Sequence, residues 1–207
     1  FYDGGTLDRW IKNPANVAPI AGDAGVIDCQ SELGVLRRLL PLQQVLSALA
    51  FTHALPAVHG DIKLSNILMT SEGSAVLTDF DLARDLSHSQ AGGAATTRLG
   101  AGTVGFMAPE VMAGGRASAS SDLWAFAMCC IHVRRLSILY RSRFHLDVCC
   151  YQVLAPGLPF ELDATTLAVP QSLLERIGQA NPELGKLLKL LLNSDPKKRP
   201  PSADVLG

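Results

Sequence analysis

The stretch 59–66, His-Gly-Asp-Ile-Lys-Leu-Ser-Asn, constrains this chain more than any other part of its sequence. It places a carboxylate at Asp61 and an amide at Asn66, and a second carboxylate at Asp79 follows thirteen residues after Asn66. The apolar residues on either side of 71–74 read as two short strands joined by a tight turn. A hairpin of these strands would bring Asp79 back beside the loop.

These side chains suit chemistry on nucleotide phosphates. Phosphoryl transfer needs a carboxylate beside the acceptor hydroxyl and metal ions on the phosphates. Mg²⁺ prefers hard oxygen ligands, often one or two carboxylates together with phosphate oxygens. A single Asp in a loop is normally a turn or cap residue. The ordered set of Asp61, Asn66 and Asp79 instead favours magnesium-dependent phosphoryl transfer.

The same residues resemble the catalytic loop of eukaryotic protein kinases, His-Arg-Asp-x-Lys-x-x-Asn, and the Asp-Phe-Gly motif of that family. The resemblance implies that Asp61 is the catalytic base and that Lys63 contacts the transferring phosphate. It also implies that Asn66 and Asp79 bind Mg²⁺ and help to bind ATP, with Leu68 beneath the adenine ring. Lysine two residues after Asp61 is the serine/threonine pattern, and a tyrosine-kinase-like or related group stays open.

His-Gly-Asp with a later Asp-Phe-Asp is also similar to the aminoglycoside and choline phosphotransferases. Three later segments resemble protein kinases instead: GTVGFMAPE at 102–110, SDLWAFA at 121–127 and DPKKRPPSA at 195–203. By that resemblance, Glu110 and Arg199 form a buried ion pair and Asp122 holds the backbone of the catalytic loop. Thr103 is expected to hydrogen-bond to a residue of that loop.

The predicted fold is protein-kinase-like, the C-terminal lobe only, mainly α with a small β-hairpin. Residues 1–207 are interpreted as a partial kinase domain that starts just after the hinge, since 4–7 resembles the stretch past the hinge and no glycine-rich phosphate loop precedes it. The apolar period predicts one long helix over 31–53, with a kink or two abutting helices at Pro41. Further helices are expected from Ser121 and over 172–193.

Two residues depart from the family pattern. Gly60 stands where the family has the Arg that meets a phosphate on the activation loop, so switching by phosphorylation of Thr96 or Thr97 is less expected. Asp81 replaces the usual Gly, which limits backbone freedom and adds negative charge near the metal site. The implied function is transfer of the ATP γ-phosphate to protein Ser/Thr hydroxyls. The alternatives are a pseudokinase or protein-interaction module without catalysis, and an incomplete gene product.

A larger departure lies at 131–150. Removing these twenty residues joins DLWAFAMCC to YQVLAPGLPF and restores the length of the family pattern, and removing 129–148 gives the same joined sequence. Our hypothesis is a retained intron or an alternative splice product inserted into the buried central helix. A natural family insertion is the alternative. In either case, we expect a loop that interrupts the hydrogen bonds of that helix.

Composition narrows the partners. The net charge of −1 gives no basic surface for nucleic acid, and no segment supplies eighteen uninterrupted apolar residues for a membrane span. The five cysteines show neither a disulfide framework nor a metal-binding spacing. The resemblance to protein kinases implies ATP and a protein substrate as partners, and the cysteine usage makes a cytoplasmic location the expectation.

Overall fold

The structure is a computed structural model that describes residues 3–11, 13, 16, 32–85, 104–139 and 169–206. Its helices are α1 (Leu7–Trp10), α3 (Glu32–Ala54), α4 (Pro109–Met112), α5 (Ala119–Leu139), α7 (Gln171–Ala180), α8 (Pro182–Leu191) and α9 (Ser202–Leu206). Its strands are β1 (Gly5–Thr6), β2 (Ala57–Val58), β3 (Ile67–Met69), β4 (Ala75–Leu77) and β5 (Arg84–Asp85). Short 3₁₀ turns occur at Leu64–Asn66, Val104–Phe106 and Pro196–Lys198.

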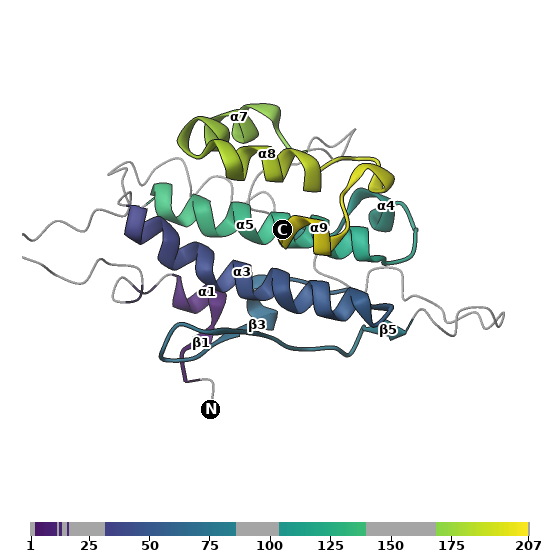
Figure 1. Ribbon diagram of the computed structural model, residues 1–207, viewed down its shortest axis with the longest axis horizontal. Helices are drawn as coiled ribbons and strands as arrows, with labels where there is room; N and C mark the ends of the chain where they lie inside the picture. The colour runs from purple at the N-terminus through teal and green to yellow at the C-terminus, as the bar shows by residue number, and fades with distance from the viewer. Residues whose placement is uncertain are drawn as a thin grey trace, which may run out of the picture.

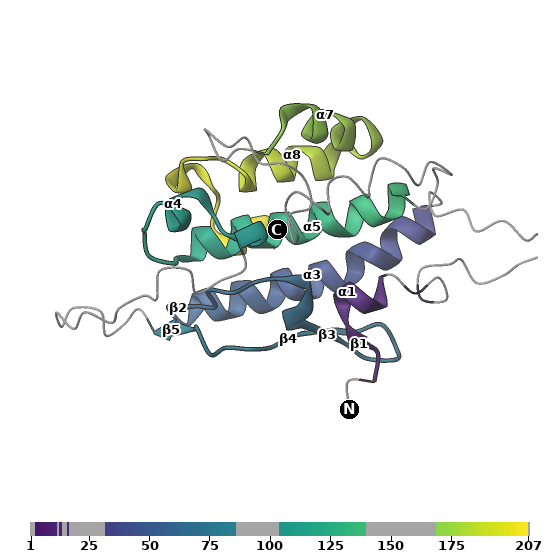
Figure 2. The ribbon, with the colours of Figure 1, turned by 180° about the vertical axis from the view of Figure 1, so that it is seen from behind.

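The elements are stacked around two long helices. Helices α3 and α5 lie side by side, and α8 packs on α5 on the side away from α3, with α7 above α8 (Figure 1). The strands lie on the opposite side of α3, where β4 contacts that helix (Figure 2). Helix α9 returns to contact α3, so the end of the described chain lies against the centre of the fold.

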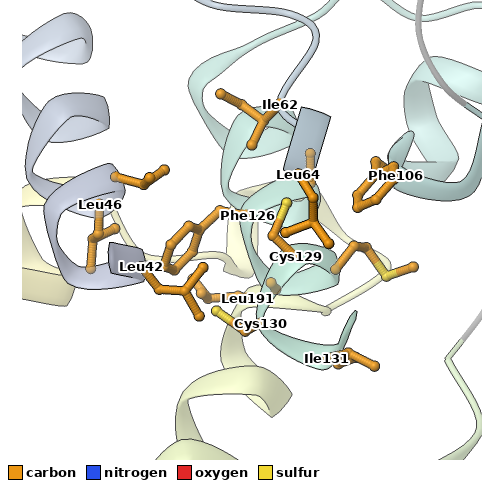
Figure 3. Packing of buried hydrophobic residues seen from close by; sticks show 14 of the residues in the cluster. Leu42, Leu46, Ile62, Leu64, Phe106, Phe126, Cys129, Cys130, Ile131 and Leu191 are labelled. Atoms are coloured by element: carbon orange, nitrogen blue, oxygen red, sulfur yellow. The ribbon is translucent and has the colours of Figure 1, made fainter. Parts of the chain in front are cut away.

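Residues 121–131 of helix α5 form the middle of the core, because all of them are buried. Such burial is expected for a helical segment whose apolar residues are not confined to one face. Figure 3 shows Phe126, Cys129, Cys130 and Ile131 of α5 in the same buried cluster as Leu42 of α3, Leu191 of α8, and Leu64 and Phe106 of two 3₁₀ turns. Burial raises the pKa of Cys130 to about 12, and burial with the neighbouring Cys130 raises that of Cys129 well above its ordinary value.

The predicted hairpin is confirmed. Strands β3 and β4 pair antiparallel, with Ile67 opposite Leu77 and Leu68 opposite Val76. The structure adds β1 on the other edge of β3, where Thr6 is opposite Leu68. Strands β2 and β5 form a separate two-stranded sheet. These two additions were not predicted, because two-residue strands carry no alternating pattern.

The long predicted helix is also confirmed, but the division at Pro41 is not. One helix spans Glu32–Ala54 with Pro41 inside it, so the alternative of two abutting helices is wrong. Pro41 is buried. A proline inside a helix removes one backbone hydrogen bond. The packing of the Pro41 side of α3 against the core can offset this loss, since tertiary packing supplies most helix stability. The expected N-cap, Ser31, lies outside the described residues.

The segment 131–150 does not begin as a loop. Helix α5 passes Cys130 without interruption and continues to Leu139. Ile131 is 0% exposed and belongs to the buried hydrophobic cluster (Figure 3). The expectation of a loop starting at 131 is therefore wrong for 131–139, because the first residue of the segment is apolar and extends the buried helix. Residues 140–150 lie outside the described residues. Among the described helices, none is long and apolar enough to cross a membrane.

Candidate active site

The backbone of the loop at 59–63 is held by the first turns of α5. Both oxygens of the Asp122 carboxylate accept from this loop: Oδ2 from the His59 amide at 2.8 Å and Oδ1 from the Gly60 amide at 2.9 Å. Asp122 is 2% exposed, so these bonds are shielded from water. The predicted role of Asp122 is confirmed, and Asp61 follows directly after the two anchored amides.

The ring of His59 fills the space behind the loop and ties it to the end of β4. Its Nε2 lies 3.0 Å from the Thr78 carbonyl oxygen, and its Nδ1 lies 3.2 Å from the Asp61 amide. A carbonyl can only accept and an amide N–H can only donate, so both contacts are satisfied when the ring proton is on Nε2. The ring also lies 4.5 Å from that of Phe80, centroid to centroid. The sequence analysis assigned His59 no role.

Asp61, Lys63 and Asn66 meet in one cluster, as the hypothesis of a site requires. The Lys63 ammonium lies 2.6 Å from Oδ2 of Asp61. The Asn66 amide nitrogen donates to the Asp61 carbonyl at 2.9 Å and to the same Oδ2 at 3.2 Å. The Asp61 carboxylate is therefore oriented by two donors on one oxygen. In Asn66 these contacts use the nitrogen, and the amide oxygen is the atom suited to a cation.

The hairpin brings the start of the Asp79 segment to this cluster. The Thr78 amide donates to the Asn66 carbonyl at 2.9 Å, and the Thr78 hydroxyl donates to the same oxygen at 3.1 Å. Asp79, the next residue, is exposed and has a φ of 65°. A left-handed backbone is uncommon for a residue other than glycine, and such strain concentrates at functional sites. The exposed Asp79 carboxylate offers the hard oxygen ligands that Mg²⁺ prefers.

Leu68 lies in the middle strand of the three-stranded sheet, between Thr6 and Val76. It is half-buried, whereas its neighbours Ile67 and Met69 are buried. Because side chains alternate along a strand, Leu68 faces away from the side that carries Ile67 and Met69. An apolar, partly accessible side chain at this position fits contact with a flat ring.

The two departures from the family pattern have different backbone consequences. Gly60 has a φ of 83°, and a Cβ there would lie 3.3 Å from the Leu82 carbonyl oxygen. Glycine adopts this conformation without the cost that a side chain would add. Asp81 is exposed and is not among the described non-glycine residues with a positive φ. The backbone at Asp81 therefore does not require glycine.

The predicted Glu110–Arg199 ion pair is confirmed and is bidentate. The two guanidinium nitrogens of Arg199 lie 2.6 and 2.8 Å from the two carboxylate oxygens of Glu110. Arg199 also donates to the carbonyl oxygens of Asn193 and Ser120, and its guanidinium lies 4.9 Å from the Trp124 ring centroid. The Arg199 side chain is 0% exposed and that of Glu110 is 21% exposed, so the burial is unequal.

The backbone that carries Glu110 is closed by two glycines. The Gly115 amide donates to the Glu110 carbonyl at 2.8 Å, and the Gly114 amide donates to the Val111 carbonyl at 3.0 Å. With Gly114 at a φ of 91°, this is a Schellman ending of helix α4. Thr103, Thr96 and Thr97 lie outside the described residues.

The sequence analysis missed His53, near the end of α3. Its two ring nitrogens lie 2.9 Å from the Ser202 hydroxyl and 3.1 Å from Oδ2 of Asp122. A histidine in the last turn of a helix is normally interpreted as an interaction with the helix dipole. No local pattern could identify its partners, because they are 149 and 69 residues away in the sequence.

Comparisons with known proteins agree with this geometry. Residues 36–207 match the family described as "Protein kinase domain". The chain is 32% identical over 137 residues to L-type lectin-domain containing receptor kinase VII.1 of Arabidopsis thaliana, covering 64% of the chain and 18% of that protein. It is 40% identical over 89 residues to MAP kinase kinase skh1/pek1 of Schizosaccharomyces pombe, covering 43% and 23%. It is 36% identical over 108 residues to serine/threonine-protein kinase pak-1 of Caenorhabditis elegans, covering 52% and 18%.

The chain thus spans about a fifth of the length of these curated relatives. The family match includes the loop at 59–66, the hairpin, Glu110, Asp122 and Arg199. The hydrogen bonds of Asp122 and the Glu110–Arg199 pair connect these motifs in space. The chain belongs to the protein kinase domain family.

Proposed function

We propose that this chain is the C-terminal lobe of a serine/threonine protein kinase domain that transfers the γ-phosphate of ATP to protein Ser/Thr hydroxyls. The observation that carries the proposal is the Asp61 cluster. Lys63 and Asn66 both bond to Oδ2 of Asp61, so Oδ1 is the oxygen available to a substrate hydroxyl. The lobe assignment is supported by the mainly helical fold with one small three-stranded sheet.

Each proposed role follows from the chemistry of one side chain. Asp61 accepts a hydrogen bond from the substrate hydroxyl and orients it. Lys63, a cation 2.6 Å from that carboxylate, stabilises negative charge that develops on the transferred phosphate. Asn66 and Asp79 would hold Mg²⁺ through oxygen atoms, and Leu68 would lie beneath the adenine. Bound Mg²⁺ supplies charge neutralisation of the nucleotide phosphates.

Specificity for Ser/Thr rests on Lys63 and on the relatives. Lys63 lies two residues after Asp61, as in the serine/threonine pattern, and pak-1 of Caenorhabditis elegans is named a serine/threonine-protein kinase. A cytoplasmic location and a protein substrate are part of the same proposal.

The second candidate is a pseudokinase or interaction module. It is favoured by Asp81, whose exposed carboxylate is two residues from Asp79 and adds negative charge beside the expected cation ligand. It is also favoured by the segment 131–150, whose first residue is built into the core.

A phosphoryl-transfer assay on the full-length polypeptide that carries this sequence separates the candidates. The wild type, Asp61→Asn and a form without 131–150 are compared with radiolabelled ATP, Mg²⁺ and a generic Ser/Thr protein substrate. Loss of the base should lower kcat by roughly 10²–10⁴-fold. Transfer that survives Asp61→Asn would contradict the catalytic assignment. Absence of transfer in both the wild type and the shortened form would favour the interaction module.

A further inference from the structure

His53 connects three parts of the fold that are distant in the sequence. Its ring lies between the first residue of α9 and the carboxylate at the start of α5, with Nδ1 2.9 Å from the Ser202 hydroxyl and Nε2 3.1 Å from Oδ2 of Asp122. The side chains of His53 and Asp122 are 7% and 2% exposed, and Ser202 is 5% exposed. The contacts are therefore shielded from water, where a hydrogen bond has more influence on geometry.

The partners of His53 set the direction of each hydrogen bond in the neutral imidazole. A carboxylate oxygen accepts, so Nε2 carries the ring proton and donates to Asp122. Nδ1 of the neutral ring is then an acceptor, and the Ser202 hydroxyl donates to it. The same Asp122 carboxylate accepts from the His59 and Gly60 amides. The row therefore runs from Ser202 through His53 and Asp122 to the backbone of the loop.

Serine, histidine and aspartate in contact also occur in hydrolases, but this row cannot act in that way. A nucleophilic serine must reach a substrate, and Ser202 is buried. Both oxygens of Asp122 already accept backbone amides, which commits the carboxylate to the loop at 59–60. The row acts on the loop.

We propose that His53 is a positioning residue for the phosphoryl transfer described above, and this inference rests on that proposed function. By donating to Oδ2, His53 fixes the rotation of the Asp122 carboxylate and thus both backbone bonds of the loop. Asp61 follows Gly60 directly, and its amide donates to the ring of His59. A shift of the Asp122 carboxylate would move the base, and small misplacement of a reacting group costs up to about 10²-fold in rate.

Two substitutions divide the row at the histidine. The amide of His53→Gln reaches the position of Nε2 and can donate to Asp122, but it leaves Ser202 without its partner. The amide of His53→Asn reaches only the position of Nδ1, so it keeps Ser202 and loses Asp122. Thr52→Ala is the matched control: Thr52 is the buried neighbour of His53, and its hydroxyl donates within α3 to the Ala48 carbonyl, its one partner among the residues that the structure describes.

The experiment measures kcat, KM for ATP and amide hydrogen exchange at His59 and Gly60 in the full-length polypeptide. His53→Asn should lower kcat by roughly 10–100-fold with KM for ATP unchanged, and it should accelerate exchange at both amides. His53→Gln and Thr52→Ala should retain kcat within about threefold and leave both exchange rates as in the wild type.

The proposal is overturned if His53→Asn and His53→Gln have equal kcat and equal exchange rates. It is also overturned if the loss of kcat in His53→Asn is no larger than the fraction of unfolded protein explains, which is the outcome expected for Thr52→Ala. If the wild type itself shows no transfer, the proposed function fails, and the exchange rates decide this inference alone. Acceleration in His53→Asn but not in His53→Gln then supports positioning of the loop, and equal rates contradict it.

Discussion

Replacing Glu110 by Gln should destabilise the fold far more than a substitution in an ordinary ion pair. The change leaves the charge of Arg199 buried, since that side chain is 0% exposed. Removing one partner of a buried pair costs about 3–5 kcal/mol. Arg199 keeps its bonds to the carbonyls of Asn193 and Ser120 and its contact with Trp124, and water can reach the Glu110 side. We therefore expect the lower end, about 3 kcal/mol.

The chain offers a matched control in the pair Lys186–Glu183, whose side chains are 2.9 Å apart but 72% and 82% exposed. Glu183→Gln should cost less than about 0.5 kcal/mol because water screens the charges. Amide hydrogen exchange of α5 and α8 in increasing urea gives the local free energy of opening for both variants in the full-length polypeptide. Losses that agree within about 0.5 kcal/mol would refute the argument that burial of Arg199 makes the difference.

Two further predictions concern the core. A Cβ at Gly185 would lie 2.5 Å from the Gly178 Cα, whereas one at Gly178 would lie 3.8 Å from the Gly185 Cα. Gly185→Ala should therefore lower the free energy of unfolding of α7 and α8 by about 1–3 kcal/mol. Gly178→Ala should raise it by up to about 1 kcal/mol, because alanine favours the helix over glycine. Urea titration measures both variants, and equal effects would contradict this argument. The pKa of Cys130 is raised from 9.0 to about 12, so its stabilising contribution is complete below pH 9 and is lost as the pH rises from 9 to 12. The free energy of unfolding should fall by about 1.4 kcal/mol per pH unit for this thiol, Cys130→Ala should reduce that slope, and an unchanged slope would show that the thiol is not the cause.

The sequence predicts the parts of the site whose spacing is short or whose motif is complete. The hairpin and the cluster of Asp61, Lys63 and Asn66 lie within one stretch of chain, and the structure has both. The long-range contacts of Asp122 and Arg199 were predicted only through resemblance to a family. Nothing in the residue pattern alone specifies a contact across sixty or more positions.

The features that were not predicted also depend on contacts between residues that are distant in the sequence. His53 depends on two partners that only the packing of α3 against α5 and α9 brings together. The close approach of Gly178 and Gly185 likewise depends on how α7 packs against α8. A single glycine in a helical sequence does not predict such a contact. Strands β1, β2 and β5 are two residues long, and each pairs with another strand. Their own residues do not predict this pairing, because two residues are too few to show an alternating pattern.

The segment 131–150 allows the insertion hypothesis to be tested against the core itself. Ile131 is fully buried, so Ile131→Ala should cost about 3 kcal/mol through the cavity that it leaves. Removal of the whole segment joins Cys130 to Tyr151, and the tyrosine ring would take the helical position of Ile131. The deletion also removes the His132 ring, which stacks 4.8 Å from that of Phe106.

If the segment is an insertion, the twenty-residue deletion should cost less than half as much as the single substitution, because an aromatic side chain refills the space. The anchor of the loop at 59–63 lies before Cys130, since the Asp122 carboxylate accepts both backbone hydrogen bonds. Exchange at the Gly60 amide should therefore be the same in the shortened form and in the wild type. Hydrogen exchange over 119–130 in increasing urea gives the free energy of opening of α5 in the wild type, in Ile131→Ala and in the shortened form. A deletion that costs as much as Ile131→Ala would show that 131–150 is an integral part of the core, and the hypothesis of an inserted segment would then be wrong.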